Sequence, residues 1–126
     1  MSGLRYTEDH EWILVEDDGV ALTGITHYAQ DQLGELVYVG LPSVGTDIDQ
    51  GEVCAEIESV KAAGELKMPV RGTVLEVNES LVDAPERINS DPTGNGWVVR
   101  FRIADSSEVE SLMDEEAYNE YTKGLS

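Results

Sequence analysis

Short apolar runs separated by polar turn residues recur along most of this 126-residue chain. Trp12-Ile13-Leu14-Val15 and Val20-Ala21-Leu22-Thr23 are two such runs, and they flank Glu16-Asp17-Asp18-Gly19. Because an Asp-Gly pair suits the tight turn between antiparallel strands, this stretch predicts a β-hairpin. Leu36-Val37-Tyr38-Val39 predicts a further strand, so the chain is expected to be mainly β.

Helical signals interrupt this pattern at two places. Thr26 is expected to cap a short helix that stops at Gly34. Near the C-terminus, Ser107 begins a sequence that fits a capping box, and Asp114 is placed to cap a further turn or helix. We therefore expect one short internal helix and a C-terminal helical segment over about 106–123.

The middle of the chain predicts a second hairpin, over about 53–70. In 53–58 the alternation of residue types places the odd-numbered side chains on the core face. Apolar and charged residues alternate again after a break, where Pro69 suggests an edge strand. The intervening Ser59-Val60-Lys61-Ala62-Ala63-Gly64 is short enough to be the hairpin tip. Lys61 is therefore predicted to project from a turn, away from the core.

The charge balance excludes several classes of partner. Acidic residues number 26 against 8 basic ones, which gives a formal net charge of −18. Binding of nucleic acid requires clustered Lys and Arg, so it is not expected, and neither is binding to an anionic membrane. An acidic surface favours solubility, and it would attract basic patches on partner proteins. The apolar stretches are too short to span a bilayer, and the N-terminus lacks a signal peptide, which indicates a cytoplasmic protein; a mature mitochondrial form stays open.

Residues for catalysis are scarce in this single predicted domain of residues 1–126. The two histidines, His10 and His27, lie far apart in the sequence, and neither a nucleophile elbow nor a phosphate-binding loop occurs. Cys54 is the only cysteine, so an internal disulfide is impossible and a zinc site is not expected. Because Cys54 lies in an apolar run, it is interpreted as a core residue. The sequence favours a protein without catalytic residues.

Lys61 is unusual because the chain has only two other lysines, Lys67 and Lys123. A lysine that is to be acylated must be accessible and firmly presented, and a hairpin tip meets both needs. The small residues Ala62, Ala63 and Gly64 leave room for a modifying enzyme. Acylation would remove the charge of the lysine. Position alone still favours an ordinary solvated lysine, because lysine is common on loops.

The pentapeptide Glu58-Ser59-Val60-Lys61-Ala62 resembles the lipoylation sequence of glycine cleavage H proteins. The resemblance extends over nearly the whole chain in short blocks that occur in the family's order. The blocks are His10-Glu11-Trp12, Gly24-Ile25-Thr26, Ala29-Gln30, Leu33-Gly34, Leu41-Pro42 with Gly45, Val77-Asn78-Glu79, Pro85, Ile88-Asn89-Ser90-Asp91-Pro92 and Gly96-Trp97.

This resemblance implies a barrel-sandwich hybrid fold, as in lipoyl and biotinyl domains, with covalently attached lipoate on Lys61. It also implies a carrier role in glycine catabolism. The arm would take an aminomethyl group from glycine dehydrogenase (decarboxylating) to the tetrahydrofolate-dependent aminomethyltransferase, and dihydrolipoamide dehydrogenase would reoxidise it. A lipoate-attaching enzyme is a further implied partner. The chemistry would then belong to the cofactor and the partners.

By analogy with the family, the loaded arm is expected to fold back into a cleft lined by an acid. The candidates are Glu11, with Asp9 beside it, and Glu65. Near the tip the sequence departs from the family pattern. Glu65 keeps an acid where the family has Asp, but Lys67 replaces an aromatic residue.

Three alternatives remain open. A lipoate relay protein would share the fold and Lys61 but donate lipoyl groups to 2-oxoacid dehydrogenases, and glycine-dependent CO₂ exchange would separate the two roles. A biotinyl carrier is disfavoured because Val60 and Ala62 flank the lysine where biotin domains place methionines. An unmodified interaction module would carry no acyl group on any lysine.

Overall fold

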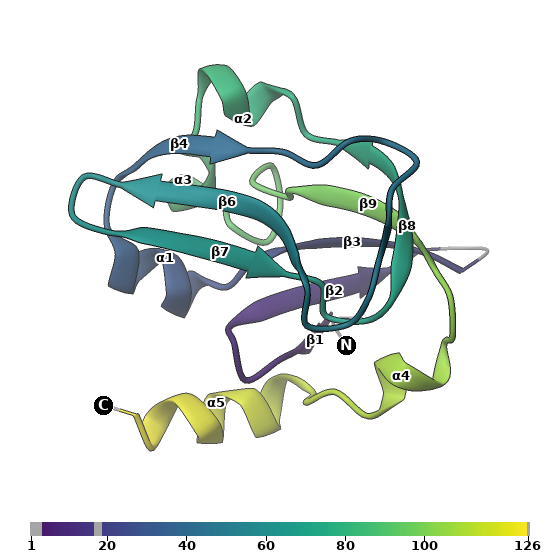
Figure 1. Ribbon diagram of the computed structural model, residues 1–126. Coiled ribbons are helices and arrows are strands. Elements are labelled where there is room, and N and C mark those ends of the chain that lie inside the picture. The colour runs from purple at the N-terminus through teal and green to yellow at the C-terminus, as the bar shows by residue number, and fades with distance from the viewer. Residues whose placement is uncertain (1–3, 17–18, 126) are drawn as a thin grey trace.

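A computed structural model describes residues 4–16 and 19–125, which form two antiparallel sheets and several short helices (Figure 1). The six-stranded sheet has the strand order β1 (Leu4–Tyr6), β2 (Glu11–Val15), β3 (Val20–Ile25), β9 (Val99–Ile103), β8 (Gly72–Val77) and β5 (Asp47–Ile48). The three-stranded sheet has the order β4 (Leu36–Gly40), β6 (Val53–Ser59) and β7 (Ala63–Lys67). The helices are α1 (His27–Leu33), α2 (Ser80–Asp83), α3 (Arg87–Ser90), α4 (Ser107–Glu110) and α5 (Glu115–Lys123).

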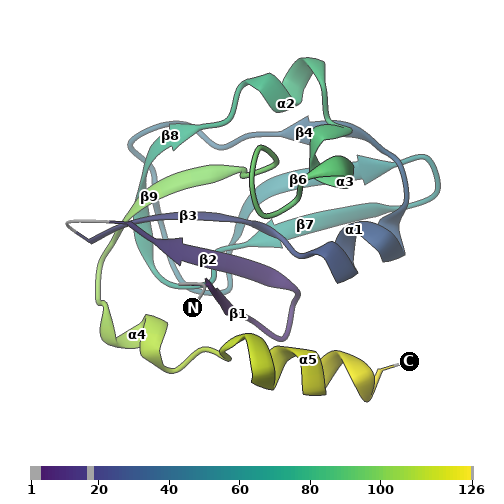
Figure 2. The ribbon, with the colours of Figure 1, turned by 180° about the vertical axis from the view of Figure 1, so that it is seen from behind.

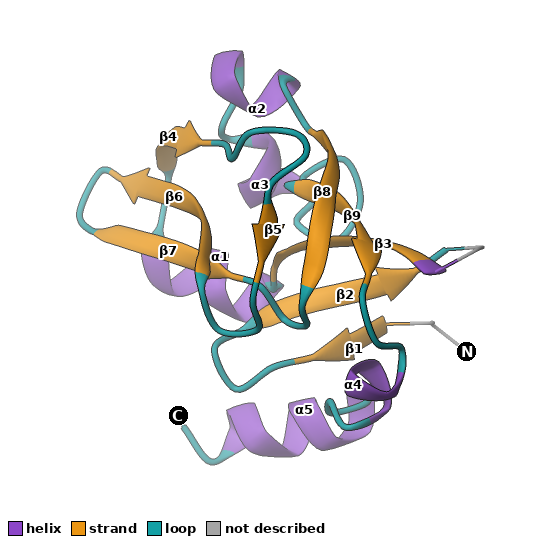
Figure 3. Cartoon of the chain, turned by 45° about the vertical axis from the view of Figure 1, so that its right-hand side comes forward, coloured by secondary structure: helices purple, strands orange, loops and turns teal. Residues whose placement is uncertain are grey.

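The two sheets, whose arrangement can be followed in Figure 3, pack on a shared apolar core. Ile13 and Phe101 enter this core from the six-stranded sheet, and Val39, Ile57 and Leu66 enter it from the three-stranded sheet. All five side chains are almost completely buried. Burial on this scale is the main favourable contribution to folding. The mainly β, sandwich-like fold expected from the sequence is confirmed.

The first predicted hairpin is confirmed as β2 and β3. Its register pairs Trp12 with Gly24 and Val15 with Ala21. Asp17 and Asp18 of the expected turn lie outside the described residues. Gly24 is needed for packing, because a Cβ there would lie 2.9 Å from Nε1 of the fully buried Trp12.

The second predicted hairpin is confirmed as β6 and β7, but two details of its expected pattern are wrong. A β-bulge between Val53 and Ala55 breaks the alternation, so Cys54 is buried together with Ala55 and Val53 is 43% exposed. An extra residue in one strand reverses the faces on one side of the bulge. The second strand also ends at Lys67 rather than near Val70. As predicted, β7 lies at the edge of its sheet.

The predicted internal helix, α1, begins and ends as expected, whereas α2 and α3 are further short internal helices that the sequence pattern did not predict. The Thr26 hydroxyl accepts a hydrogen bond of 3.2 Å from the Ala29 N–H. Gly34 ends the helix with φ +82° and ψ −157°. This backbone conformation is open almost only to glycine. The chain can therefore turn sharply from α1 into β4.

The C-terminal helices confirm one predicted cap and contradict the other. Asp114 caps α5 by accepting a hydrogen bond of 2.8 Å from the Ala117 N–H. The capping box expected at Ser107 is wrong, because Ser107 is already the first residue of α4 and its hydroxyl donates to Asp105. In the described part of the chain, helices of the length and apolar character needed to cross a membrane do not occur.

Helix α5 is fixed to the body of the fold by Tyr118, and Figure 1 shows this helix running beside β1. The Tyr118 ring stacks on Tyr6 with centroids 4.6 Å apart and an interplanar angle of 11°. Its hydroxyl lies 2.7 Å from the Thr26 hydroxyl and 2.7 Å from Nδ1 of His10. Because Thr26 caps α1, Tyr118 connects the C-terminal helix to the internal helix.

We expect Tyr118→Phe to lower the free energy of unfolding by about 1–2 kcal/mol. The reason is that the buried Thr26 hydroxyl and the half-buried imidazole of His10 each lose a hydrogen-bond partner. Urea unfolding followed by tryptophan fluorescence measures the loss. Tyr121→Phe is the matched control, since the Tyr121 hydroxyl only donates a longer, exposed bond of 3.3 Å to the Glu8 carbonyl. Equal losses for the two variants would contradict this role of Tyr118.

Candidate functional site

Lys61 lies at the tip of the β6–β7 hairpin, which projects beyond the sandwich in Figure 1. Its side chain is exposed, and within the described part of the chain it has neither an ion pair nor a side-chain hydrogen bond. The two other lysines differ, because Lys67 is half-buried within β7 and Lys123 pairs with Glu120 at 3.5 Å. The prediction that Lys61 projects from an exposed hairpin tip is therefore confirmed.

Ser59 shapes the turn that presents Lys61. Its backbone N–H donates to the Ala62 carbonyl at 2.8 Å, which closes the turn. Its hydroxyl oxygen accepts from the Lys61 N–H at 3.3 Å and from the Ala62 N–H at 3.0 Å. Serine hydroxyls commonly stabilise turns by bonding to nearby backbone groups. The backbone on both sides of the lysine is thereby held, while its side chain stays in solvent.

The turn also rests on residues 34–36, the segment between α1 and β4, which we name the strap. The Glu35 carbonyl accepts a hydrogen bond of 3.0 Å from the Val60 N–H. Gly34 lies directly under the lysine, because a Cβ added there would be 3.3 Å from Cε of Lys61. Figure 2 shows α1, the strap and the hairpin tip at the same end of the molecule.

The remaining residues of the lipoylation-like pentapeptide surround the lysine on the hairpin. Glu58 is exposed and pairs with Ala63 across the two strands. Val60 is 67% exposed, although its backbone N–H is bound to the strap. Ala62 is exposed as well. Lys61 thus has small or solvent-exposed neighbours, which leaves space for another protein to approach.

A pocket of about 570 Å³ adjoins the strap, between α1 and α3. Asn89 of α3 lines it and makes hydrogen bonds to both ends of the strap. Sequence reasoning missed Asn89 and the strap, since only the tertiary fold brings them under the hairpin. The only signal was that Asn89 belongs to one of the blocks that resemble the family. The lining residues are Gln30, Asp31, Gly34, Glu35, Leu36, Glu86 and Asn89.

Glu11 is a buried carboxyl at the other end of β7, with only 2% of its surface exposed. Oε1 accepts a hydrogen bond of 2.7 Å from the Thr7 hydroxyl, and Oε2 accepts one of 3.2 Å from the Lys67 N–H. Burial raises the pKa of Glu11 to about 7, while these two hydrogen bonds act in the opposite direction and Asp9 adds to the rise. Glu11 therefore titrates near neutral pH.

The structure brings two of the three predicted cleft residues together. Asp9 and Glu11 line one cleft of about 320 Å³ between the β1–β2 turn and the segment after β7. Glu65 lines a different pocket, on the outer face of β6 and β7, opposite Glu56 in the register. The exposed carboxylate of Glu65 is thus separated from the buried carboxylate of Glu11.

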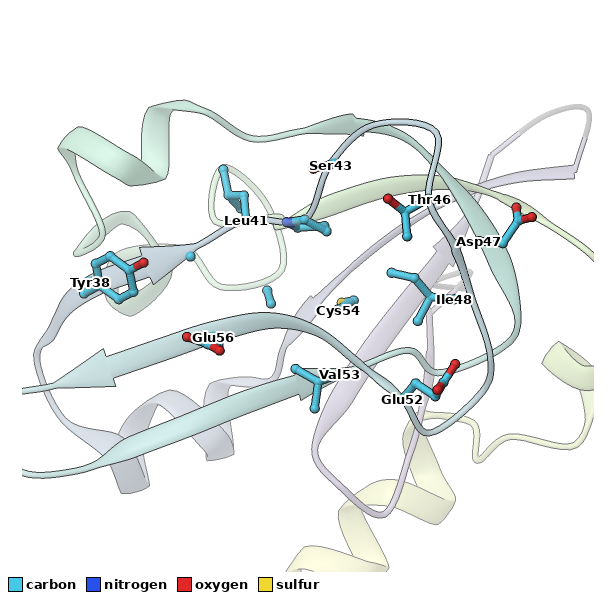
Figure 4. Close-up of a pocket in the computed structure, with 13 residues that line it drawn as sticks. Tyr38, Leu41, Ser43, Thr46, Asp47, Ile48, Glu52, Val53, Cys54 and Glu56 are labelled. Carbon is cyan, nitrogen blue, oxygen red and sulfur yellow. The ribbon is translucent and has the colours of Figure 1, made fainter.

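Another pocket, of about 620 Å³, lies between the loop after β4 and the start of β6 (Figure 4). It contains Cys54, which is buried as expected, and burial raises the pKa of its thiol to about 12. The thiol therefore stays protonated and is a poor nucleophile. Two of the three lining carboxylates accept hydrogen bonds within the fold: Asp47 accepts from the Thr73 hydroxyl, and Glu52 accepts from the Asp49 N–H. Among its lining residues we find no nucleophile and base arranged for catalysis.

Comparisons with known proteins agree with the resemblance seen in the sequence. The family model described as Glycine cleavage H-protein matches residues 4–125. The glycine cleavage system H protein of Rhodospirillum rubrum is 50% identical over 125 residues, which cover 99% of both chains. That of Thermotoga maritima is 52% identical over 117 residues, covering 93% of this chain and 94% of the relative. A crystal structure of a glycine cleavage system H protein from Mycobacterium marinum superposes with a TM-score of 0.85 at 37% identity, covering 99% of this chain and 98% of that one.

We expect Glu11 to make stability depend on pH. The folded pKa of about 7 lies above the ordinary value of 4.5, so between these values the folded protein holds a proton that the unfolded chain has released. The free energy of unfolding should therefore fall as pH rises through this window, by about 3 kcal/mol at most.

Urea unfolding of the wild type and of Glu11→Gln at about pH 5 and about pH 8 measures this effect. The variant has no carboxyl at this position, so its stability relative to the wild type should increase at the higher pH. A difference between the two proteins that does not change with pH would contradict the buried titration.

Proposed function

The chain belongs to the glycine cleavage H-protein family, and on that premise we propose that it is the lipoyl-bearing shuttle of the glycine cleavage system, with lipoate attached to Lys61. The observation that carries the proposal is the presentation of Lys61. It is an exposed lysine without an ion pair in the described chain, on a turn whose backbone is held on both sides.

The residues at the tip fit an acyl group on the lysine. Amide formation at Nζ removes a charge, and within the described residues that charge has no carboxylate partner to lose. Gly34 leaves space for the lysine stem, whereas a side chain at this position would contact Cε. An attaching enzyme can reach Lys61 because Val60 and Ala62 on either side are exposed.

The proposed partners are glycine dehydrogenase (decarboxylating), aminomethyltransferase and dihydrolipoamide dehydrogenase, together with a lipoate-attaching enzyme. When bound, lipoate would supply a disulfide that accepts the aminomethyl group and is left as a dithiol for reoxidation. This chain would supply the anchor, since a tethered arm replaces free diffusion by a high effective concentration at each partner. The cytoplasmic location expected from the sequence stays a prediction.

We further propose that the cleft of Asp9 and Glu11 receives the cationic end of the loaded arm. Glu11 is buried and held in place by Thr7 and by the Lys67 N–H. A protonated amine in this cleft would favour the ionised form of Glu11 and offset the cost of burying its charge. A role for Glu65, which lines a different pocket, stays a prediction.

We expect an intact-mass increase of one lipoyl group, mapped to Lys61, for protein made in a lipoate-replete host. Lys61→Arg should abolish both this adduct and glycine-dependent CO₂ exchange with the decarboxylating partner, whereas Lys67→Arg should retain both. An unmodified Lys61 in a host that lipoylates other proteins would contradict the proposal. A lipoylated protein that does not support the exchange would favour the lipoate relay role.

We expect Glu11→Gln to release the aminomethyl group faster than the wild type, because the amide cannot neutralise the amine. Protein charged with the group and separated from its partners allows the half-life of the cargo to be measured by mass. Glu110→Gln is the matched control, since it makes the same change at an exposed position on α4. Equal half-lives for Glu11→Gln and wild type would rule out this use of the cleft.

A further inference from the structure

We propose that Asn89, on α3, is a positioning residue for the modification of Lys61. It acts through the strap, the segment 34–36 on which the lysine turn rests. This inference rests on the proposed function, because it assigns a remote residue to the presentation of the same lysine. Within the described residues Asn89 has no hydrogen bond to Lys61 or to the turn, since its three hydrogen bonds all go to α1 and the strap.

The amide of Asn89 holds both ends of the strap. Oδ1 accepts a hydrogen bond of 2.9 Å from the Leu36 N–H. Nδ2 donates to the Gly34 carbonyl at 2.8 Å and to Oε1 of Gln30, a buried side chain of α1, at 2.9 Å. One side chain therefore binds the Gly34 carbonyl, the Leu36 N–H and a side chain of α1. The only strap residue without a bond to Asn89 is Glu35, which lies between the two that it holds.

Glu35 is the residue that passes this constraint to the lysine turn. Its carbonyl accepts the Val60 N–H at 3.0 Å, and Val60 directly precedes Lys61. Gly34 is a second point of approach, because a Cβ added there would lie 3.3 Å from Cε of Lys61. A shift of the strap would therefore move the support of the turn at both points. Beyond the last β6–β7 pair, Glu58 with Ala63, the Ser59 bonds close the turn on itself. Its support from outside the hairpin comes from the strap, whose Leu36 also pairs with Ser59 in the β4–β6 ladder.

The strap needs such an anchor because its own backbone has little regular structure. Gly34 has a conformation outside the helical and strand regions, and Leu36 is only the first residue of β4. The register of β4 on β6 also shifts between Leu36 and Tyr38, which marks an irregular ladder at this point. Asn89 provides the hydrogen-bond partners of the Gly34 carbonyl and the Leu36 N–H at this point.

A purely stabilising role is the competing explanation, and the chain offers a matched control for it. Asn78 has the same set of bonds in another part of the fold. Its Nδ2 donates to the carbonyls of Asn95 and Trp97 at 2.9 and 2.8 Å, and its Oδ1 accepts from the Ser80 hydroxyl at 2.6 Å. Asn78→Ala therefore removes two donated bonds and one accepted bond, as Asn89→Ala does, without touching the strap.

The first test is amide hydrogen exchange on the full-length protein before lipoylation. Asn89→Ala should raise the exchange rate of the Val60 amide by about fivefold or more, since the support of its acceptor is lost. Asn78→Ala should leave that rate unchanged relative to amides of the core. Equal Val60 rates in the two variants would overturn the proposal. If Asn89→Ala does not fold, Asn89→Asp carries the same test, because it keeps the acceptor for Leu36 and loses both donors.

The second test is the rate of lipoyl transfer to the full-length unmodified proteins by a lipoate-attaching enzyme. With Asn89→Ala, kcat/KM should fall on the order of tenfold, because the lysine is presented less often in the reactive position. Asn78→Ala should react like the wild type. Absence of an adduct on wild-type Lys61 would overturn the proposed function itself. A normal rate for Asn89→Ala beside a modified wild type would overturn only the positioning role.

Discussion

The hydrogen bond from the Val60 N–H to the Glu35 carbonyl is the contact on which the presentation of Lys61 depends. The Ser59 hydrogen bonds close the turn on itself, but they do not join it to the rest of the fold. The bond joins the tip to the strap, and through Asn89 to α3. Tyr118 extends the same support from the opposite end of α1, where its hydroxyl meets the helix cap Thr26. An exposed side chain is thus combined with a fixed backbone.

Buried polar groups connect this scaffold to its proposed chemistry. Burial of the Glu11 carboxylate is energetically unfavourable, and an apolar residue at the same position would avoid this cost. Its two hydrogen bonds reduce that cost and also fix its orientation toward the cleft that it shares with Asp9. Sites that bind charged groups commonly contain such shifted carboxyls. The burial that raises the pKa of Glu11 would thus lower stability as the group ionises, and the proposed cationic arm would offset that cost.

Local sequence patterns predicted most of the elements but not their long-range contacts. The Thr26 and Asp114 caps depend on residues three positions apart, and both were predictable. The bulge at Val53 was not, because it depends on the partner strand β7 rather than on the alternation within β6. Lys61 was identified from its turn and from a family resemblance. The role of Asn89 could not be predicted, because its bonding partners lie more than fifty residues away in the chain.

The burial of Cys54 has a consequence for an arm that alternates between a disulfide and a dithiol. Thiol–disulfide exchange requires an accessible thiolate, and the rate depends on the fraction of thiol that is ionised. This protein has one cysteine, Cys54, which is buried in the core, and burial raises the pKa of its thiol to about 12. The chain thus lacks a reactive thiol of its own that could form a mixed disulfide with a lipoyl arm. The oxidation state of a bound lipoyl group would therefore be set by the partner enzymes and not by the protein that carries it.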